Sequence, residues 1–388
     1  MLDDRTRKLL LTLTSLPTAA GEEDAVLASV RAWAKRRKRI LLAADAAGNL
    51  TLRLREEAGG GPPVLLVAHT DHPAAVVAGI DPGDPRRLRA RFRGGVSEPH
   101  FRGSAVRLWR GGRRCGRGVV VGVDRREASG PDADDPVLAV AFARPVEAEP
   151  GDVLAWDLPA ARVRGSRLQA PACDDLAGVA AALATLDAQA RRRSIDPGEA
   201  PLRVLLTRAE EVGFVGAVAA CLAGTLEPDA RVIVLECSKA SAEAPLGAGP
   251  VVRVGDRSST FDPALTAAVA SAAAELAGAP VPGGTPAFRW QRKLMTGGTC
   301  EATAYAAFGL AATCVCVPLG NYHNMSDTRP GTIEREVISL RDFGGMLRLL
   351  AALPARLGPG VGGGAAALRD RLVRQHAGRA GLLAGEDA

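Results

Sequence analysis

The amino-acid sequence predicts an α/β fold: a mixed, largely parallel sheet covered by helices on both faces, with an inserted small all-β domain. Apolar runs typical of buried strands alternate with longer Ala- and Leu-rich segments typical of helices. Between about residues 75 and 163 this alternation is replaced by short apolar runs separated by Gly and Pro. With 388 residues, 47% of them hydrophobic, the chain can also form more than one domain with a sizeable core.

The N-terminal part is predicted to contain two helices, two short strands and one strand buried on both faces. The second helix opens with acidic residues and ends with basic ones, as the helix dipole favours. The buried strand is the apolar run VLLVAH, which two prolines precede. The predicted ranges are 5–16 and 22–38 for the helices and 40–43 and 50–54 for the short strands.

The segment from 75 to 163 is predicted to be the β insert. In residues 87–93 arginine alternates with Leu88, Ala90 and Phe92, which indicates a strand with one solvent-exposed face. Residues 118–123 and 136–142 indicate two further strands. The expected division is a main α/β domain (1–74 and 164–355), the insert (75–163), and a linker with a short helical tail (356–388).

After the insert, helices and strands alternate again, which predicts parallel strands covered on both sides. The expected helices are 178–193, 213–224, 263–277, 300–308 and 338–353, and the expected strands are 202–207, 231–235 and 312–317.

The net charge of +6 belongs to one segment, because residues 86–127 hold 13 arginines and three acids. Arginines interleaved with Phe92, Phe101 and Trp109 could form a nucleic-acid surface. The strict alternation better fits the solvent face of a sheet, and contact with another subunit or attraction of acidic peptides are further alternatives. We expect no nucleic-acid partner.

Seven cysteines without a CxxC pair argue against a disulfide framework and against a structural zinc site. The N-terminus has early acidic residues and only a short apolar stretch, which fits neither a signal peptide nor a membrane helix. We therefore expect a cytoplasmic protein with no membrane partner.

Imidazoles and carboxylates follow several of the apolar runs. Taken singly, each has an ordinary explanation as a helix cap, a solvated pair or a structural histidine. Their shared position at strand ends instead predicts a hydrolase site with two metal ions. The candidate residues are His69, Asp71, Asp174, Glu210, Glu211, Glu236 and His323.

The residue types suggest distinct roles. Asp71 can orient His69 through the second ring nitrogen. Of Glu210 and Glu211, one can bind a metal while the other accepts a proton from water. Asp174 is the best-placed bridge between two ions, and a buried Glu236 would be costly unless a metal neutralised it.

The strings HTD, PACDDLAG, EEVGFVGA, LEC and NYHN, with PGDVLAWD and GGT, resemble the glutamyl aminopeptidases and TET-type metallo-aminopeptidases of peptidase family M42. The resemblance spans roughly residues 3–353. The related carboxypeptidase G and aminoacylase group carries its extra domain later in the chain. Here 104 residues separate His69 from Asp174 and only 86 separate Glu236 from His323, so the position of the insert favours the TET-like arrangement.

The resemblance implies a homo-oligomeric aminopeptidase that acts on peptides with two divalent ions, most plausibly Zn²⁺, with Co²⁺ or Mn²⁺ as alternatives. Asp174 would bridge the ions, Glu210 would be the general base and Asp71 would support His69. The implied ligands are His69, Asp174 and Glu236 for one ion and Asp174, Glu211 and His323 for the other.

Four positions depart from the family pattern: His72, Leu176, Glu236 and Cys300 stand where Glu, Arg, Asp and Asp are usual. These departures affect substrate positioning more than metal binding. Two other functions therefore stay open: an amidase or deacylase acting on small N-acyl substrates, and a weakly catalytic metal-binding relative that acts as an assembly or binding protein.

Overall fold

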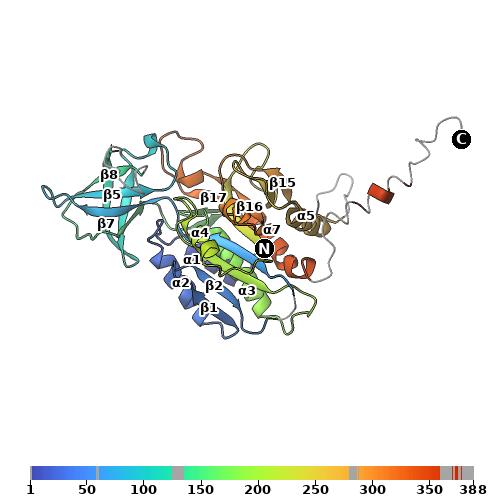
Figure 1. Ribbon diagram of the computed structural model, residues 1–388. Helices are drawn as coiled ribbons and strands as arrows, with labels where there is room; N and C mark the ends of the chain where they lie inside the picture. Colours follow the sequence, from blue (N-terminus) through green and yellow to red (C-terminus); the bar gives the residue numbers. More distant parts are fainter. Residues whose placement is uncertain are drawn as a thin grey trace, which may run out of the picture.

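The computed structural model describes residues 2–57, 61–124, 135–278, 286 and 288–358, with 369, 372–374 and 377 near the C-terminus. A large mixed sheet with its helices forms the main body, and a small β-barrel lies at one end of it (Figure 1). The predicted mixed α/β fold with a β insert is confirmed. The predicted linker and tail beyond Gly358 lie almost entirely outside the described residues.

The large sheet has the order β1-β2-β12-β3-β13-β16-β17-β11-β10, and β14 and β15 extend it beside β16. The four central strands, β12, β3, β13 and β16, are parallel, whereas the other strands pair antiparallel, except β15, which pairs parallel with β14. The carboxyl ends of the central strands therefore meet at one edge. The strands are β1 Ile40–Ala44, β2 Leu50–Leu54, β3 Val64–His69, β10 Arg162–Arg164, β11 Arg167–Ala170, β12 Leu202–Thr207, β13 Arg231–Lys239, β14 Val251–Gly255, β15 Gln291–Leu294, β16 Ala311–Gly320 and β17 Glu336–Ser339.

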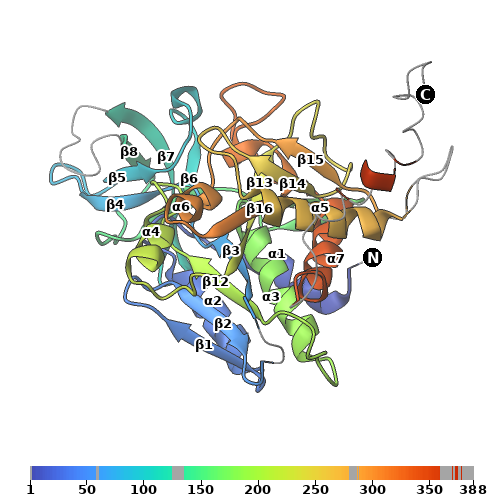
Figure 2. The same ribbon diagram turned by 45° about the vertical axis from the view of Figure 1, so that its right-hand side comes forward.

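Helices cover both faces of this sheet because its central strands are apolar on both sides. In β3, Val64, Leu66 and Ala68 pack into one core, while Leu65 and Val67 pack into the other. Helix α3 lies across β3, β12 and β13 in the first core (Figure 2). The first face carries α1 Asp4–Leu13, α2 Asp24–Lys35, α3 Leu176–Ala190, α5 Pro263–Ala277 and α7 Leu340–Arg356, and the second carries α4 Val215–Leu222 and α6 Glu301–Ala307.

Six strands of the insert close into a barrel in the order β4-β5-β8-β7-β6-β9. Closure leaves no free sheet edge, which protects an isolated β unit from pairing with other chains. The alternation in β5 turns Leu88, Ala90 and Phe92 into the barrel core, as predicted. The domain boundaries at 75 and 163 stay predictions. The barrel strands are β4 Ala74–Ile80, β5 Arg87–Arg93, β6 Ala105–Arg110, β7 Arg113–Asp124, β8 Val137–Phe142 and β9 Val153–Trp156.

Several arginines of the insert have acidic neighbours. Arg107 and Arg117 each lie 2.6 Å from a different carboxylate oxygen of Asp157, and Arg110 lies 3.0 Å from Asp152. Part of the local positive charge is thus neutralised within the insert. These pairs support the interpretation of the arginines as the solvent face of a sheet.

Some elements differ from the sequence-based expectation. The unexpected strands are β4, β6, β9, β10, β11, β14, β15 and β17. Strands β10, β11 and β15 have only three or four residues each and carry arginines or other polar side chains. Strand β13 continues through Glu236 to Lys239, beyond the apolar run that predicted it. The expected helix at 338–353 begins instead at Leu340, after β17, with Ser339 as its N-cap.

Two further expectations concern cysteines and membranes. All seven cysteines are free thiols, as the absence of a CxxC pair led us to expect. Among the described residues, no helix is both long and apolar enough to cross a membrane.

Candidate metal centre

The candidate residues meet at the carboxyl edge of the central strands, on the face covered by α4 and α6. Strand β3 ends in His69, and Glu236 lies in the neighbouring strand β13. Val67 pairs with Val234 in the parallel register, so two residues further along His69 and Glu236 point to the same side of the sheet. A cavity of about 480 Å³ opens over this edge.

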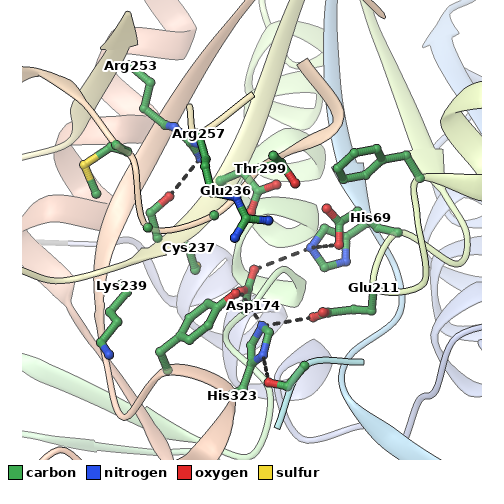
Figure 3. Close-up of a pocket in the computed structure, with 18 of the residues that line it drawn as sticks. His69, Asp174, Glu211, Glu236, Cys237, Lys239, Arg253, Arg257, Thr299 and His323 are labelled. Carbon is green, nitrogen blue, oxygen red and sulfur yellow. Dashed lines mark hydrogen bonds and ion pairs between the residues drawn. The ribbon is translucent and has the colours of Figure 1, made fainter. Parts of the chain in front are cut away.

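Two groups of side chains within this cluster share Asp174 and can each hold one ion. The first is His69, Asp174 and Glu236, and the second is Asp174, Glu211 and His323; a third, overlapping group is His69, Glu210 and Glu211. In each group the coordinating atoms lie within 4.8 Å of one another. Figure 3 shows these side chains converging on Asp174, which belongs to both groups. The structure therefore brings together all five residues that the sequence suggested as ligands.

The spacing within the cluster fits bound cations. Asp174 Oδ1 lies 3.4 Å from His69 Nε2, and Glu211 Oε1 lies 3.5 Å from His323 Nε2. Both carboxylate oxygens are buried and accept no hydrogen bond from the described residues. Histidine nitrogens and carboxylate oxygens that face one another at these distances form a donor set suited to Zn²⁺ and similar divalent ions.

Each histidine has an oxygen atom near its other ring nitrogen. His323 Nδ1 lies 2.6 Å from the Gly95 carbonyl oxygen, which can only accept a hydrogen bond. The proton is therefore on Nδ1, and the lone pair of Nε2 faces Asp174 and Glu211. His69 Nδ1 lies 3.3 Å from Asp71 Oδ1 but makes no hydrogen bond of regular geometry with the described residues, and the supporting role of Asp71 stays a prediction.

Asp71 also fixes the turn that carries the glutamate pair. Its two carboxylate oxygens accept the backbone N–H groups of Glu210 and Glu211, both at 3.0 Å. Burial opposes ionisation of Asp71, but His69 and these N–H groups favour the carboxylate and lower its pKa below the usual value. One ionised side chain thus connects β3 to the segment after β12.

The electrostatics of the cluster favour bound positive charge. Burial raises the pKa values of Glu210, Glu211 and Glu236 well above the usual range, and neighbouring carboxylates raise them further. Burial alone would lower the pKa of His69, but Glu210, Asp174 and Asp71 raise it well above its usual value. So many buried acids are stabilised when divalent cations bind among them.

Sequence reasoning missed Glu336, a fully buried residue at the start of β17. Its Oε2 accepts the backbone N–H groups of Cys173 and Asp174 at 2.6 and 3.0 Å. Its Oε1 accepts the N–H of His323 at 2.9 Å. Glu336 therefore holds two ligand-bearing segments in place. Its context, EREVIS, resembles an ordinary polar segment and gives no signal of this role.

Glu23 was expected to be a first-turn acid of the second helix, but it belongs to the base of the site. Its carboxylate accepts N–H groups of Gly21 and Ala209 at 2.7 and 3.0 Å and pairs with Arg208 at 2.7 Å. Ala209 has a φ of 52°, an uncommon conformation for a residue with a side chain. These bonds hold that conformation directly before Glu210.

His72 and Cys300, two of the departures from the family pattern, are both buried. His72 contacts the backbone oxygen of Asp174 through Nδ1 at 2.6 Å and Asn324 Oδ1 through Nε2 at 2.9 Å. It therefore supports the Asp174 backbone rather than binding a metal in the two groups above. The N–H of Cys300 donates to Asp256 at 3.0 Å.

Solved structures with the same fold include several peptidases. An aminopeptidase from Desulfurococcus kamchatkensis is 23% identical, with a TM-score of 0.71, and the match covers 90% of this chain and 94% of that chain. A TET aminopeptidase from a marine-sediment Thaumarchaeota archaeon is 19% identical, with a TM-score of 0.73 and coverages of 92% and 98%. The TET1 peptidase of Pyrococcus horikoshii is 22% identical, with a TM-score of 0.69 and coverages of 90% and 99%.

No curated protein sequence matches the chain. A sequence profile of the family described as M42 glutamyl aminopeptidase, however, matches residues 48–335. This range is most of the chain and contains both ligand groups and the glutamate pair. The chain therefore belongs to the M42 glutamyl aminopeptidase family, whose members are metal-dependent peptide hydrolases.

Proposed function

We propose that this protein removes N-terminal residues from peptides with two divalent metal ions, most plausibly Zn²⁺, held in the groups described above. The observation that carries the proposal is the pair of ligand groups that share Asp174 inside one cavity. Such ions, when bound, polarise a carbonyl group and lower the pKa of water.

The proposed roles of the other residues follow from their positions. Glu210 Oε2 lies 3.9 Å from His69 Nε2 and belongs to neither ligand group that shares Asp174. With the ions held in those two groups, its carboxylate is left to take a proton from the attacking water and to pass it to the leaving amine, although Glu210 also belongs to a third possible group with His69 and Glu211. Asp71 keeps Glu210 in place through the backbone N–H, and its carboxylate beside His69 Nδ1 favours a proton on that nitrogen, which would leave Nε2 to bind an ion.

Replacement of Glu210 by Gln tests this assignment. We expect kcat/KM on aminoacyl-anilides to fall about 1000-fold, because general bases contribute roughly 10²- to 10⁴-fold. Metal content, measured by elemental analysis, should stay at two ions per chain. Glu243→Gln, which changes an exposed glutamate, is the matched control and should have the wild-type rate. A wild-type rate in the Glu210→Gln variant would refute the role of Glu210 as base.

The substrate panel for the wild-type enzyme should include N-acyl amino acids beside the aminoacyl-anilides. The same water-activating residues can hydrolyse any amide, so only the panel separates an aminopeptidase from a deacylase. Turnover of N-acyl substrates alone would contradict the proposal. Fewer than two ions per chain under saturating zinc would contradict the two-metal site.

We also propose a homo-oligomer. The solved relative of the same fold from Pyrococcus horikoshii is described as assembling into a tetrahedron or an octahedral shell, and another TET1 structure as a dodecamer. Light scattering on the purified chain tests this proposal, and a mass of about 40 kDa would contradict it. The cytoplasmic location stays a prediction.

A further inference from the structure

Three buried cysteines lie together next to the cavity. Cys300 is the residue before α6, and Cys314 and Cys316 lie two residues apart on β16. All three are fully buried and pack into the core on the second face of the sheet. The Cys314 thiol donates a hydrogen bond to the sulfur of Cys300. We call these three residues the thiol cluster.

A buried arginine connects the thiol cluster to the cavity. Arg253 lies opposite Cys314 where β14 pairs with β16, and its guanidinium interacts electrostatically with all three thiols. Arg253 is only 3% exposed, yet it lines the cavity, as does Thr299 directly before Cys300 (Figure 3). Its Nε is buried and has no hydrogen-bond partner among the described residues. A small polar molecule in the cavity therefore comes close to Arg253 and to the segment that carries Cys300.

The surroundings of Cys300 favour its thiolate form. Burial opposes ionisation, but the hydrogen bond from Cys314 and the positive charge of Arg253 lower the pKa of the Cys300 thiol below its usual value. The thiolate is the form of cysteine that attacks oxidants. Burial raises the pKa of Cys314 well above its usual value, so Cys314 stays a thiol. The two sulfur atoms thus differ as an attacking and a resolving cysteine differ.

Two other uses of the thiol cluster fit the structure less well. Among the described residues, no group of three potential ligand atoms within 4.8 Å of one another contains these sulfur atoms, and Arg253 beside them disfavours a cation. A disulfide between Cys314 and Cys316 is unfavourable, because parallel side chains two residues apart on a strand are separated by about 7 Å. Cys300 and Cys314 instead come from different elements and already contact each other through their thiols.

We propose that Cys300 and Cys314 are a modification site at which hydrogen peroxide forms a disulfide and thereby inactivates the enzyme reversibly. The loss of activity, but not the formation of the disulfide, rests on the proposed aminopeptidase function.

The reaction has two steps, which together oxidise two thiols and reduce one peroxide to two water molecules. The Cys300 thiolate attacks one peroxide oxygen, so the O–O bond breaks, an S–O bond forms, and the released hydroxide takes up the proton that the thiol has lost. The positive charge of Arg253 stabilises this leaving hydroxide. The Cys314 sulfur then attacks the Cys300 sulfur, so the S–O bond breaks, the S–S bond forms, and the second hydroxide takes up the Cys314 proton.

The disulfide should alter the wall of the cavity. The N–H of Cys300 donates to Asp256 at 3.0 Å, and the N–H of Arg257 donates to the Gly298 carbonyl oxygen at 3.0 Å, so Cys300 is connected to residues that line the cavity. A sulfur–sulfur bond of about 2.05 Å is much shorter than a hydrogen bond between thiols, so its formation pulls Cys300 towards β16. It also removes the thiolate that balances the buried Arg253 guanidinium.

The test is a peptide map of the oxidised protein. The metal-loaded wild-type chain is treated with hydrogen peroxide, unfolded, alkylated with a maleimide and digested. We expect mass spectrometry to find the peptides of Cys300 and Cys314 linked and lighter by two hydrogen atoms. Dithiothreitol added before alkylation should abolish the link.

Variants identify the two partners. Cys300→Ser should form no link, and Cys314→Ser should instead carry an oxygen atom on Cys300, which dimedone captures. Cys316→Ser should form the link as the wild type does. The matched control is Cys115→Ser, which removes an exposed thiol from β7 of the insert and should also form the link.

The same samples are assayed on an aminoacyl-anilide. In the wild type, peroxide should lower kcat/KM by about tenfold or more, because small displacements near a reacting centre are costly, and dithiothreitol should restore it. The Cys300→Ser variant should keep its own rate after the same treatment.

The inference is overturned if the wild type forms no link between Cys300 and Cys314, or if the link leaves the rate of an active enzyme unchanged. A link between Cys314 and Cys316, or a Cys300→Ser variant that peroxide inactivates as strongly as the wild type, would overturn it as well. If the reduced protein hydrolyses no aminoacyl-anilide, the proposed aminopeptidase function fails, while the peptide map still decides whether the two thiols form a disulfide.

Discussion

At the scale of single residues, the candidate site depends on carboxylates that lie outside both ligand groups. Asp71, Glu23 and Glu336 accept backbone N–H groups from segments that carry a proposed base or ligand. Burial raises the pKa values of Glu23 and Glu336, whereas the pKa of Asp71 is lowered. The positions of the ligands are thus fixed by buried carboxyl groups that satisfy backbone N–H donors, as well as by strand geometry.

Glu336→Gln should weaken metal binding. The amide has one acceptor oxygen, so its NH₂ group would face one of the three N–H donors that Glu336 now satisfies. We expect metal affinity to fall roughly 10- to 100-fold and stability to fall by about 2 kcal/mol. Competition with a chromophoric chelator and urea unfolding measure these two effects.

The control for this variant is Glu334→Gln, two residues earlier. The Glu334 side chain pairs with Ser326 and Arg329 near the surface rather than with the backbone of Asp174 or His323. The Glu334→Gln variant should retain wild-type metal affinity. Equal affinities of the Glu336→Gln variant and the wild type would show that Glu336 does not position the ligands.

Four of the five candidate ligands could be picked out from the sequence because each lies near the end of a recognisable apolar run, and Asp174 could be picked out from the string PACDDLAG. Glu23 and Glu336 could not, because their role depends on partners far away in the sequence. Glu336 contacts Cys173 across 163 positions, and Glu23 contacts Ala209 across 186. The sequence alone does not distinguish a buried acid that accepts hydrogen bonds from distant backbone N–H groups from an acid exposed to solvent.

At the scale of elements, helix α6 brings a buried acid beneath the site. Glu301 occupies the first turn of α6, and its Oε2 accepts a hydrogen bond from Thr207 at the end of β12 at 2.9 Å. Burial raises the pKa of Glu301 from 4.5 to about 7, although His69 and Thr207 act in the opposite direction. The folded chain therefore holds this proton more tightly than the unfolded chain.

Glu301→Gln should change the pH dependence of stability. The raised pKa of Glu301 contributes to the free energy of unfolding. This contribution is fully present below pH 4.5 and is lost as the pH rises through about 7. Glutamine does not titrate, so the Glu301→Gln variant does not lose stability in this way. The free energy of unfolding of the variant minus that of the wild type should therefore increase between pH 4.5 and 8, by at most about 3 kcal/mol. Urea unfolding of the metal-free proteins at several pH values measures the difference.

The exposed Glu243→Gln change again provides the comparison for Glu301 and should give a pH-independent difference from wild type. If the difference in free energy of unfolding between Glu301→Gln and wild type is also independent of pH, the raised pKa of Glu301 is contradicted.

Element prediction succeeded where an apolar run or an alternation was clear, and it missed the short polar strands and three strands of the barrel, β4, β6 and β9. The central strands β3 and β12 follow uninterrupted apolar runs, and β5 follows a strict alternation. Strand β15 contains the four residues QRKL, which give no apolar signal because the strand adds to an edge of the sheet. Its existence depends on the pairing with β14.

At the scale of the whole molecule, bound ions should stabilise the folded chain. Ligands of the two groups come from both sides of the insert, so binding is linked to folding. Metal at 1000 times its dissociation constant adds about 4 kcal/mol, which corresponds to about 5 °C in Tm for a chain of this length. A chelator should lower Tm by this amount in differential scanning calorimetry.

Asp174→Asn is the variant for comparison, because Asp174 is the residue that both ligand groups share. The chelator should have a much smaller effect on its Tm. Equal shifts in the variant and the wild type would mean that the ions responsible bind elsewhere.

The insert could be located from composition, but its closure into a barrel and its contact with the site could not. Closure requires β9 to pair with both β4 and β6, a non-local arrangement that no single run of residues specifies. The Gly95 carbonyl, just after β5, contacts His323 only because the whole chain folds the two segments together.

The 228 positions between Gly95 and His323 have a consequence for protein synthesis. The ribosome releases His69, Asp174 and the glutamate pair well before His323, so an unfinished chain lacks one ligand of the second group. We expect a nascent chain to be unable to cleave its neighbours until translation is nearly finished. Chains truncated at Gly320 should accordingly hydrolyse no aminoacyl-anilide, and activity in such a truncated chain would contradict this expectation.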